Sequence, residues 1–162
     1  MPKRSSTNKP LRDWVFFTDR NLGNIIPVAL VAAGHSVERH DAHFLPTTPD
    51  EEWLPIVAGK GWIALTHDKR IRSVPAQRDT AMRAGLALFI LVGQLQHQQL
   101  ALNLVATLPR IMQFRNKHEP PFIAKVHRPD QKHPIGSRLG VVDMSLSNED
   151  WVAMLKNERT NL

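Results

Sequence analysis

The chain has 162 residues, 42% of them hydrophobic and 22% charged, which is the composition of a folded globular domain rather than of a disordered chain. It contains no cysteine, and this excludes a disulfide framework, thiolate zinc sites and cysteine nucleophiles. The net charge of +6 favours an anionic partner such as nucleic acid. No window approaches the roughly 18 apolar residues of a membrane span, and no signal-peptide core follows the basic start, so we expect a cytoplasmic protein without membrane association.

Apolar runs and turn residues predict an alternation of strands and helices, in chain order 14–18 (strand), 24–33 (helix), 36–40 (strand), 48–59 (helix), 62–66 (strand), 75–84 (helix), 86–92 (strand) and 95–114 (helix). Thr48 is predicted to cap the second helix in a capping box with Glu51, with Pro49 in the first helical position. Pro109 is expected to kink or split the last helix. This order predicts an α/β fold, a three-layer sandwich with a mainly parallel sheet and helices on both faces.

The remainder of the chain is predicted to complete the same domain. Residues 120–126 and 140–144 predict a hairpin that extends the sheet antiparallel, and Ser147 predicts the cap of a short helix that ends near Leu155. We therefore divide the chain into a basic flexible arm (1–13), the α/β domain (14–118) and a C-terminal hairpin with a short helix packed on that domain (119–162).

Acidic residues follow the predicted strands. Asp19 comes directly after the first strand, Asp68 follows the third strand by two residues, and Asp50 and Glu51 open the helix after the second strand. Because parallel strands bring their carboxyl ends to one edge of the sheet, these side chains are expected to gather there. Carboxylates without cysteine are typical of a Mg²⁺ or Mn²⁺ site, although any one of these residues taken alone is better explained as a turn residue or a helix cap than as a metal ligand.

Four successive segments carry a family resemblance: FFTDRNLG (16–23), AAGHSV (32–37), PDEEW (49–53) and GWIALTHDKRI (61–71). In order and spacing they resemble the signatures of PIN-like nucleases, most of all the branch of VapC-type toxins with an Asp-x-Asn-Leu turn and a Thr-x-Asp-Lys motif. The resemblance covers about residues 14–92, and PPFI (120–123) is similar to the distal part of that branch. It departs at Arg20 and at Lys69-Arg70, where many relatives carry acidic residues.

The resemblance implies a PIN-like fold and a metal-dependent endoribonuclease, the toxin of a type II toxin–antitoxin pair. By position it implies Asp19, Asp50 and Asp68 as catalytic metal ligands, with Glu51 as a substitute for Asp50 or an addition to it. Asn21 and Thr66 fall at supporting positions that orient the carboxylates. The implied cofactor is Mg²⁺ or Mn²⁺, the implied partners are an RNA substrate and a cognate antitoxin protein, and a homodimer is left open.

Basic residues mark the expected RNA-binding surface. Lys69, Arg70 and Arg72 lie beside Asp68 and are predicted to hold phosphates of the scissile strand. Between Pro109 and Leu139 there are seven basic residues against two acidic ones, which is most of the excess charge. For both groups, a solvated basic surface is the alternative reading. No histidine is assigned a catalytic role, and His40 and His43 are expected in a loop.

Two other functions remain open on the sequence. A phosphoryl-accepting receiver domain also uses acidic residues at strand ends, but it normally requires an adjacent acidic pair after the first strand, where this chain has Asp19 and Arg20. It also requires a lysine after the fifth strand, which the predicted sheet does not present clearly, so this reading ranks below the nuclease. A non-catalytic basic module that binds RNA or protein, with the acids acting as caps, is the third reading. Divalent-metal-dependent cleavage of RNA separates the nuclease from both alternatives.

Overall fold

A computed structural model describes residues 14–129, 132–136 and 138–161, so the predicted arm 1–13 lies outside the described residues. One sheet has the strand order β2-β1-β3-β4-β5-β6, and every neighbouring pair is parallel except β5 and β6. Its strands are β1 (Val15–Thr18), β2 (Ser36–Arg39), β3 (Ile63–Thr66), β4 (Ala87–Leu91), β5 (Phe122–His127) and β6 (Val141–Ser147). The helices are α1 (Ile25–Ala32), α2 (His40–His43), α3 (Asp50–Gly59), α4 (Arg70–Ser73), α5 (Pro75–Ala84), α6 (His97–Lys117) and α7 (Asn148–Thr160), with a 3-10 turn, η3, over Arg20–Leu22.

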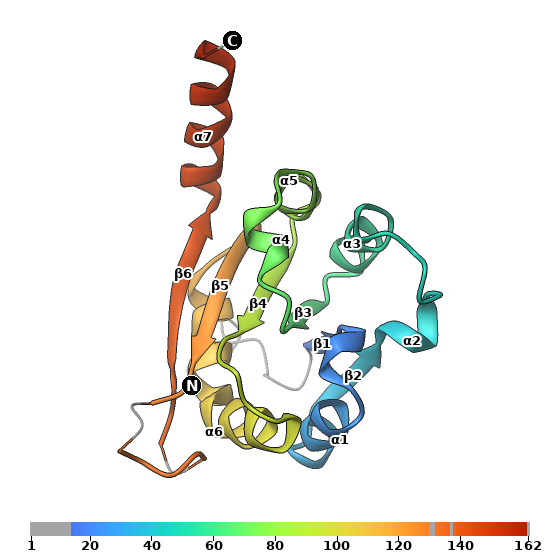
Figure 1. Ribbon diagram of the computed structural model, residues 1–162, viewed down its shortest axis with the longest axis vertical. Helices are drawn as coiled ribbons and strands as arrows, with labels where there is room; N and C mark the ends of the chain where they lie inside the picture. The colour runs from blue at the N-terminus through green and yellow to red at the C-terminus, as the bar shows by residue number, and fades with distance from the viewer. Residues whose placement is uncertain (1–13, 130–131, 137, 162) are drawn as a thin grey trace, which may run out of the picture.

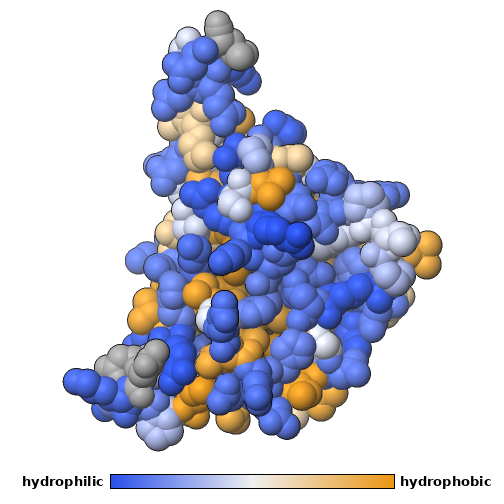
Figure 2. All heavy atoms as spheres, viewed as in Figure 1, coloured by the Kyte–Doolittle hydropathy of each residue, from blue (hydrophilic) through white to orange (hydrophobic). Residues whose placement is uncertain are grey.

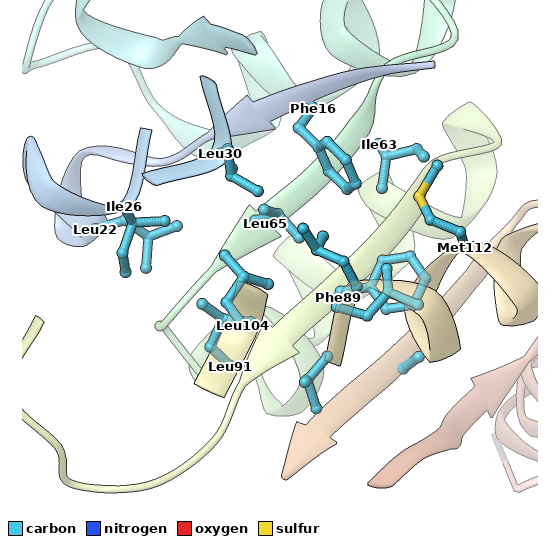
Figure 3. Packing of buried hydrophobic residues seen from close by; sticks show 14 of the residues in the cluster. Phe16, Leu22, Ile26, Leu30, Ile63, Leu65, Phe89, Leu91, Leu104 and Met112 are labelled. Atoms are coloured by element: carbon cyan, nitrogen blue, oxygen red, sulfur yellow. The ribbon is translucent and has the colours of Figure 1, made fainter. Parts of the chain in front are cut away.

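The strands bury side chains on both faces of the sheet. Phe16 and Phe89 point to the face covered by α1 and α6, whereas their neighbours Phe17 and Leu88 point to the face covered by α3, α4, α5 and α7. Figure 3 shows the first of these two cores, where side chains from β1, β3 and β4 converge on Met112 of α6. The predicted α/β class, with a mainly parallel sheet between two helical layers, is confirmed.

The start of α3 differs from the expected capping box. The N-cap is Pro49, whose ψ of 151° is extended, and no side chain caps the helix. Thr48 instead lies in the preceding turn, where its N–H donates to the carbonyl of Leu45 at 3.1 Å. The prediction of Thr48 as the cap was therefore wrong, and the helix begins at Asp50.

Two short segments form single helical turns, and the first of them was expected to be a loop. His40–His43 forms α2 and Arg70–Ser73 forms α4, in which the fully buried Ile71 packs against the core below α3 and α5. Pro109 was expected to kink or split the long helix, but α6 is unbroken from His97 to Lys117, with Pro109 exposed inside it. The strand and helix pattern is otherwise as expected, with α7 continuing past Leu155 to Thr160.

The end of the chain is tied to the domain through α7, which projects from the end of β6 (Figure 1). Ser147 caps the helix as predicted, because its Oγ accepts from the N–H of Asp150 at 3.1 Å. One turn later the indole N–H of Trp151 donates to Asp79 of α5 at 2.8 Å, and the buried Arg78 donates to the same carboxylate oxygen at 2.9 Å. Asp79 therefore joins α7 to α5.

We expect Asp79→Asn to destabilise the fold by about 2 kcal/mol, because it leaves the buried guanidinium of Arg78 facing a neutral side chain. Burial opposes ionisation of Asp79, but the hydrogen bonds from Arg78 and Trp151 hold its pKa below the ordinary value. Its contribution to stability is thus present above about pH 4 and is lost as the pH falls through the lowered pKa.

Urea unfolding of wild type and Asp79→Asn at neutral pH and below pH 4 measures this contribution, and the difference between them should shrink at the lower pH. Asp41→Asn is the matched control, since Asp41 pairs with Arg39 on the exposed surface, where such pairs contribute little. An Asp79 variant as stable as the control would contradict the anchoring of α7.

None of the helices in the described ranges is both long and apolar enough to cross a membrane.

Candidate functional site

The carboxyl ends of the parallel strands place Asp19 and Asp68 next to each other. Asp19 continues the pairing of β1 with β3, because its backbone N–H donates to the carbonyl of Leu65 at 3.1 Å. Asp68 follows β3 by two residues, and Asp50 opens α3 across the same edge. Sequence reasoning placed these acids at strand ends and at a helix start, and the structure does so too.

Thr66 links the carboxylate of Asp19 to its surroundings. Its hydroxyl donates to Asp19 Oδ2 at 2.9 Å and accepts from the side-chain amide of Asn21 and from the backbone N–H of Asp68, both at 3.1 Å. The side-chain oxygen of Asn21, Oδ1, accepts from the backbone N–H of His67 at 3.1 Å. Every donor and acceptor of the Thr66 hydroxyl is therefore used, and the turn after β3 is fixed against the turn after β1.

The carboxylates of Asp19 and Asp50 are destabilised in their charged forms. Burial raises the pKa of Asp19, and the negative charge of Asp68 adds to this effect against the hydrogen bonds from Thr66 and from the N–H of Arg20. Burial also raises the pKa of Asp50, to which the charges of Asp19, Asp68 and Glu51 contribute. Asp68 is thus close enough to influence the ionisation of Asp19 and Asp50, and Asp19 is close enough to influence that of Asp50.

Asp50 is held by a residue that sequence reasoning did not assign to the site. The indole N–H of Trp53, which is fully buried between α3 and the sheet, donates to Asp50 Oδ1 at 2.9 Å. Asp50 and Trp53 are three residues apart on one helix, a spacing at which side chains contact each other, and this spacing could have indicated the interaction from the sequence. Glu51 is exposed in the same helical turn and makes no hydrogen bond or ion pair among the described residues.

Asp68 is paired with the arginine two residues further on. Arg70 Nε and Nη2 donate to the two oxygens of Asp68 at 2.9 and 2.8 Å, and the backbone N–H of Arg70 also donates to Oδ1 at 3.0 Å. These hydrogen bonds hold the pKa of Asp68 below its ordinary value. The Asp68 side chain is only 18% exposed, whereas Arg70 is 73% exposed and lies on the surface.

The carboxylate oxygens of this site are chemically suited to bind a hard divalent cation. Asp19 and Asp50 offer carboxylate oxygens whose mutual repulsion a cation would relieve, and such oxygens are the ligands that Mg²⁺ and Mn²⁺ prefer. In the part of the chain that the structure describes, however, no three acidic or histidine side chains stand close enough to form a ready ligand group. The pairing of Asp68 with Arg70 gives a physical reason, because it directs one carboxylate to a cation that the protein itself supplies.

The three basic residues expected to bind phosphate differ in their surroundings. Lys69 is exposed beside Asp68, and Arg70 is paired with Asp68 as described. Arg72 instead donates from Nε to the hydroxyl of Ser145 at 3.0 Å, so its guanidinium joins α4 to β6. We leave Arg72 out of the phosphate-binding group proposed below.

Arg20, where the sequence departs from the family pattern, closes the other side of the turn after β1. Its Nε donates to Nδ1 of the buried His40 at 2.9 Å, and its Nη2 donates to the carbonyl of Phe44 at 2.6 Å. Arg20 thus fixes α2 beside Asp19, a role that depends on contacts 20 and 24 residues away.

Comparison with known families gives one match. Residues 15–93, a segment that contains Asp19, Asp50 and Asp68, match the family model described as PIN like domain, and PIN-like domains are generally nucleases. No curated protein and no solved structure matched the chain.

Proposed function

We propose that the PIN-like domain of residues 15–93 makes this protein a metal-dependent endoribonuclease, with Asp19, Asp50 and Asp68 as its catalytic carboxylates. The observation that carries the proposal is the position of these three residues: Asp19 and Asp68 follow the parallel strands β1 and β3, where the Thr66 hydroxyl binds both of them, and Asp50 opens α3. Burial and neighbouring carboxylates disfavour the charged forms of Asp19 and Asp50, and a bound cation would relieve this, so a cationic ligand explains the arrangement better than capping does.

Each residue of the site has a part in this proposal. A bound Mg²⁺ or Mn²⁺ would activate a water molecule and neutralise charge on the phosphoryl oxygens. Asp19, oriented by Thr66 and Asn21, and Asp50, oriented by Trp53, would hold the cation together with Asp68. Lys69 and Arg70 would bind phosphates of the substrate strand next to them.

The topology alone does not separate a nuclease from a receiver domain. The order β2-β1-β3-β4-β5 is also that of doubly wound receiver-like sheets. The family match over residues 15–93 favours the nuclease, and the acidic pair that a receiver needs after β1 is replaced by Asp19 and Arg20. Arg20 is a cation that donates hydrogen bonds to His40 and Phe44, so this position supplies no second carboxylate.

The test is cleavage of a labelled RNA by the purified protein with Mg²⁺ or Mn²⁺ and with a chelator. We expect cleavage only with the metal, and we expect Asp68→Asn to lose it while keeping the wild-type thermal transition, because the change removes charge but little volume. Full cleavage by Asp68→Asn, or cleavage that survives the chelator, would contradict the proposed site.

We further propose that the nuclease is the toxin of a toxin–antitoxin pair, restrained in the cytoplasm by an acidic protein that covers the active edge. The exposed cations Lys69 and Arg70 would steer such a partner. Phe44, Leu45, Trp53 and Phe122 were the apolar anchors considered from the sequence. Trp53 and Phe122 are core residues, each 1% exposed, which leaves Leu45, 70% exposed, as the best placed of the four.

Expression in a bacterial host tests the toxin role. Expression of the wild-type protein alone is expected to arrest growth, whereas Asp68→Asn is expected to be harmless at the same level of folded protein. Cells that express the wild-type protein are expected to grow again when the neighbouring gene is supplied. Normal growth with abundant folded wild type would refute the toxin role, and the cleavage assay would then show whether nuclease activity stands without it.

A further inference from the structure

Two stretches of the chain carry no charged side chain. No Asp, Glu, Lys or Arg occurs between Arg20 and Glu38 or between Arg83 and Arg110, although 22% of the whole chain is charged. The first stretch contains α1, and the second contains β4 and the first part of α6. β4 is buried, but α1 and α6 lie side by side on one face of the sheet (Figure 1). The surface that α1 and the first part of α6 present is therefore uncharged.

This surface is also apolar. α1 has no polar side chain, and it buries only one side of the helix. A helix that is hydrophobic all round is normally covered on every side. The exposed hydrophobic residues of the two helices form what we call the uncharged face: Ile25, Val28 and Val31 of α1 with Leu102 and Val105 of α6, which are 36% to 63% exposed. Figure 2 shows hydrophobic side chains gathered over α1 and α6, on a surface that is otherwise largely hydrophilic.

An apolar hollow adjoins this face between α1 and β2. It has a volume of about 360 Å³, and Val28 and Val31 line it together with Val37 of β2. Arg39 lies at its rim, where the guanidinium pairs with Asp41 at 3.1 Å. The hollow gives the uncharged face relief, and the cores of protein–protein interfaces combine such relief with apolar character and few charges.

The absence of charge indicates which kind of partner fits the face. RNA phosphates and acidic proteins are bound by Lys and Arg side chains, and the two stretches contain neither. A second copy of the chain brings the same uncharged apolar surface to the contact. No charged group is then desolvated, and the positive charges of the two copies stay outside the contact. Charge complementarity therefore favours a second copy over an anionic partner.

We propose that the uncharged face is the interface of a symmetric homodimer. In a dimer with two-fold symmetry both copies use the same surface, so α1 and α6 of one copy pack against α1 and α6 of the other. The outer side of α1 is then covered, as expected for a helix without polar side chains. The proposal is independent of the nuclease function, because none of the five residues of the uncharged face belongs to the carboxylate site.

The test is analytical ultracentrifugation of the full chain across the micromolar concentration range. We expect the wild type to form a dimer of twice the 18.4 kDa chain mass. Val28→Glu and Leu102→Glu are each expected to weaken dimerisation at least about 100-fold, because a symmetric interface buries the new charge twice. Both residues are more than half exposed and glutamate is a good helix former, so the monomer keeps its fold. Ile56→Glu is the matched control and should dimerise as the wild type does, since Ile56 is 45% exposed on α3, on the opposite face of the sheet.

Thermal unfolding gives a second readout. The melting temperature of the wild type should rise with protein concentration, because unfolding of a dimer is linked to its dissociation, whereas that of Val28→Glu should not. A wild-type chain that stays monomeric throughout the micromolar range would overturn the proposal. A dimer that either glutamate variant of the uncharged face leaves intact would overturn it too, and so would one that Ile56→Glu weakens equally, since the interface would then lie elsewhere.

Discussion

Asp19→Asn is expected to reduce metal-dependent RNA cleavage by at least about 100-fold while making the protein more stable at neutral pH. Asp19 is the most buried of the three aspartates that we assign to the cation, and it is the one that Thr66 holds in place. Asparagine keeps the shape and retains an oxygen for the Thr66 hydroxyl, so the change removes the charge together with one hydrogen bond, the one that Asp19 Oδ1 accepts from the N–H of Arg20 at 2.8 Å. Single-turnover cleavage with saturating Mg²⁺ measures the loss, and thermal unfolding of the same samples measures the gain.

The gain in stability has a definite dependence on pH. Because the pKa of Asp19 is raised in the folded protein, the folded state holds its proton to a higher pH than the unfolded chain does. Wild-type stability therefore falls as the pH rises from about 4 through the raised pKa, and the variant escapes this fall. The variant's higher melting temperature should be full at neutral pH and vanish below about pH 4. A variant less stable than wild type at pH 7 would show that Asp19 supports the fold rather than the site.

The elements that sequence reasoning predicted well are those with local signals. Strong apolar runs at 62–66 and 86–92 and the left-handed Gly85 after α5 mark strand and helix ends without knowledge of the rest of the chain. The single turns α2 and α4 could not be predicted in this way, because they depend on tertiary contacts such as the burial of Ile71. Thr48 lies in a sequence pattern typical of a helix cap. In the structure it instead belongs to a turn, in which its own N–H donates to the carbonyl of Leu45.

The candidate site likewise contains residues that local sequence signals predict and contacts that depend on the tertiary structure. Asp19 and Asp68 follow from strand direction alone, since parallel strands end at one edge. The bond from Arg72 to Ser145 joins residues 73 apart in the chain, and no local pattern indicates it. The direction of β5 was within reach of sequence reasoning, because the long helix before it is a crossover, which makes β5 parallel to β4.

Arg70→Ala is expected to lower the Mg²⁺ concentration that gives half-maximal cleavage by about tenfold, which corresponds to about 1.4 kcal/mol. In the wild type the guanidinium of Arg70 occupies both oxygens of Asp68, and a divalent cation must compete with it. Without the side chain, the pKa of Asp68 rises toward its ordinary value, but the carboxylate stays ionised at neutral pH and is free to bind the cation. Cleavage measured against Mg²⁺ at saturating RNA separates this effect from any loss of phosphate binding by Arg70.

Arg39→Ala is the matched control for this prediction. Arg39 makes the same kind of pair with the residue two further on, Asp41, at 3.1 Å, and among the described residues it makes no hydrogen bond or ion pair with the three aspartates of the site. It should leave the Mg²⁺ requirement unchanged. Binding of Mn²⁺ without RNA, followed by electron paramagnetic resonance, gives a readout independent of cleavage, and Arg70→Ala should bind more tightly there as well. A higher requirement for metal in Arg70→Ala would mean that Arg70 holds Asp68 in place for the cation, and the competition inferred from the structure would be wrong.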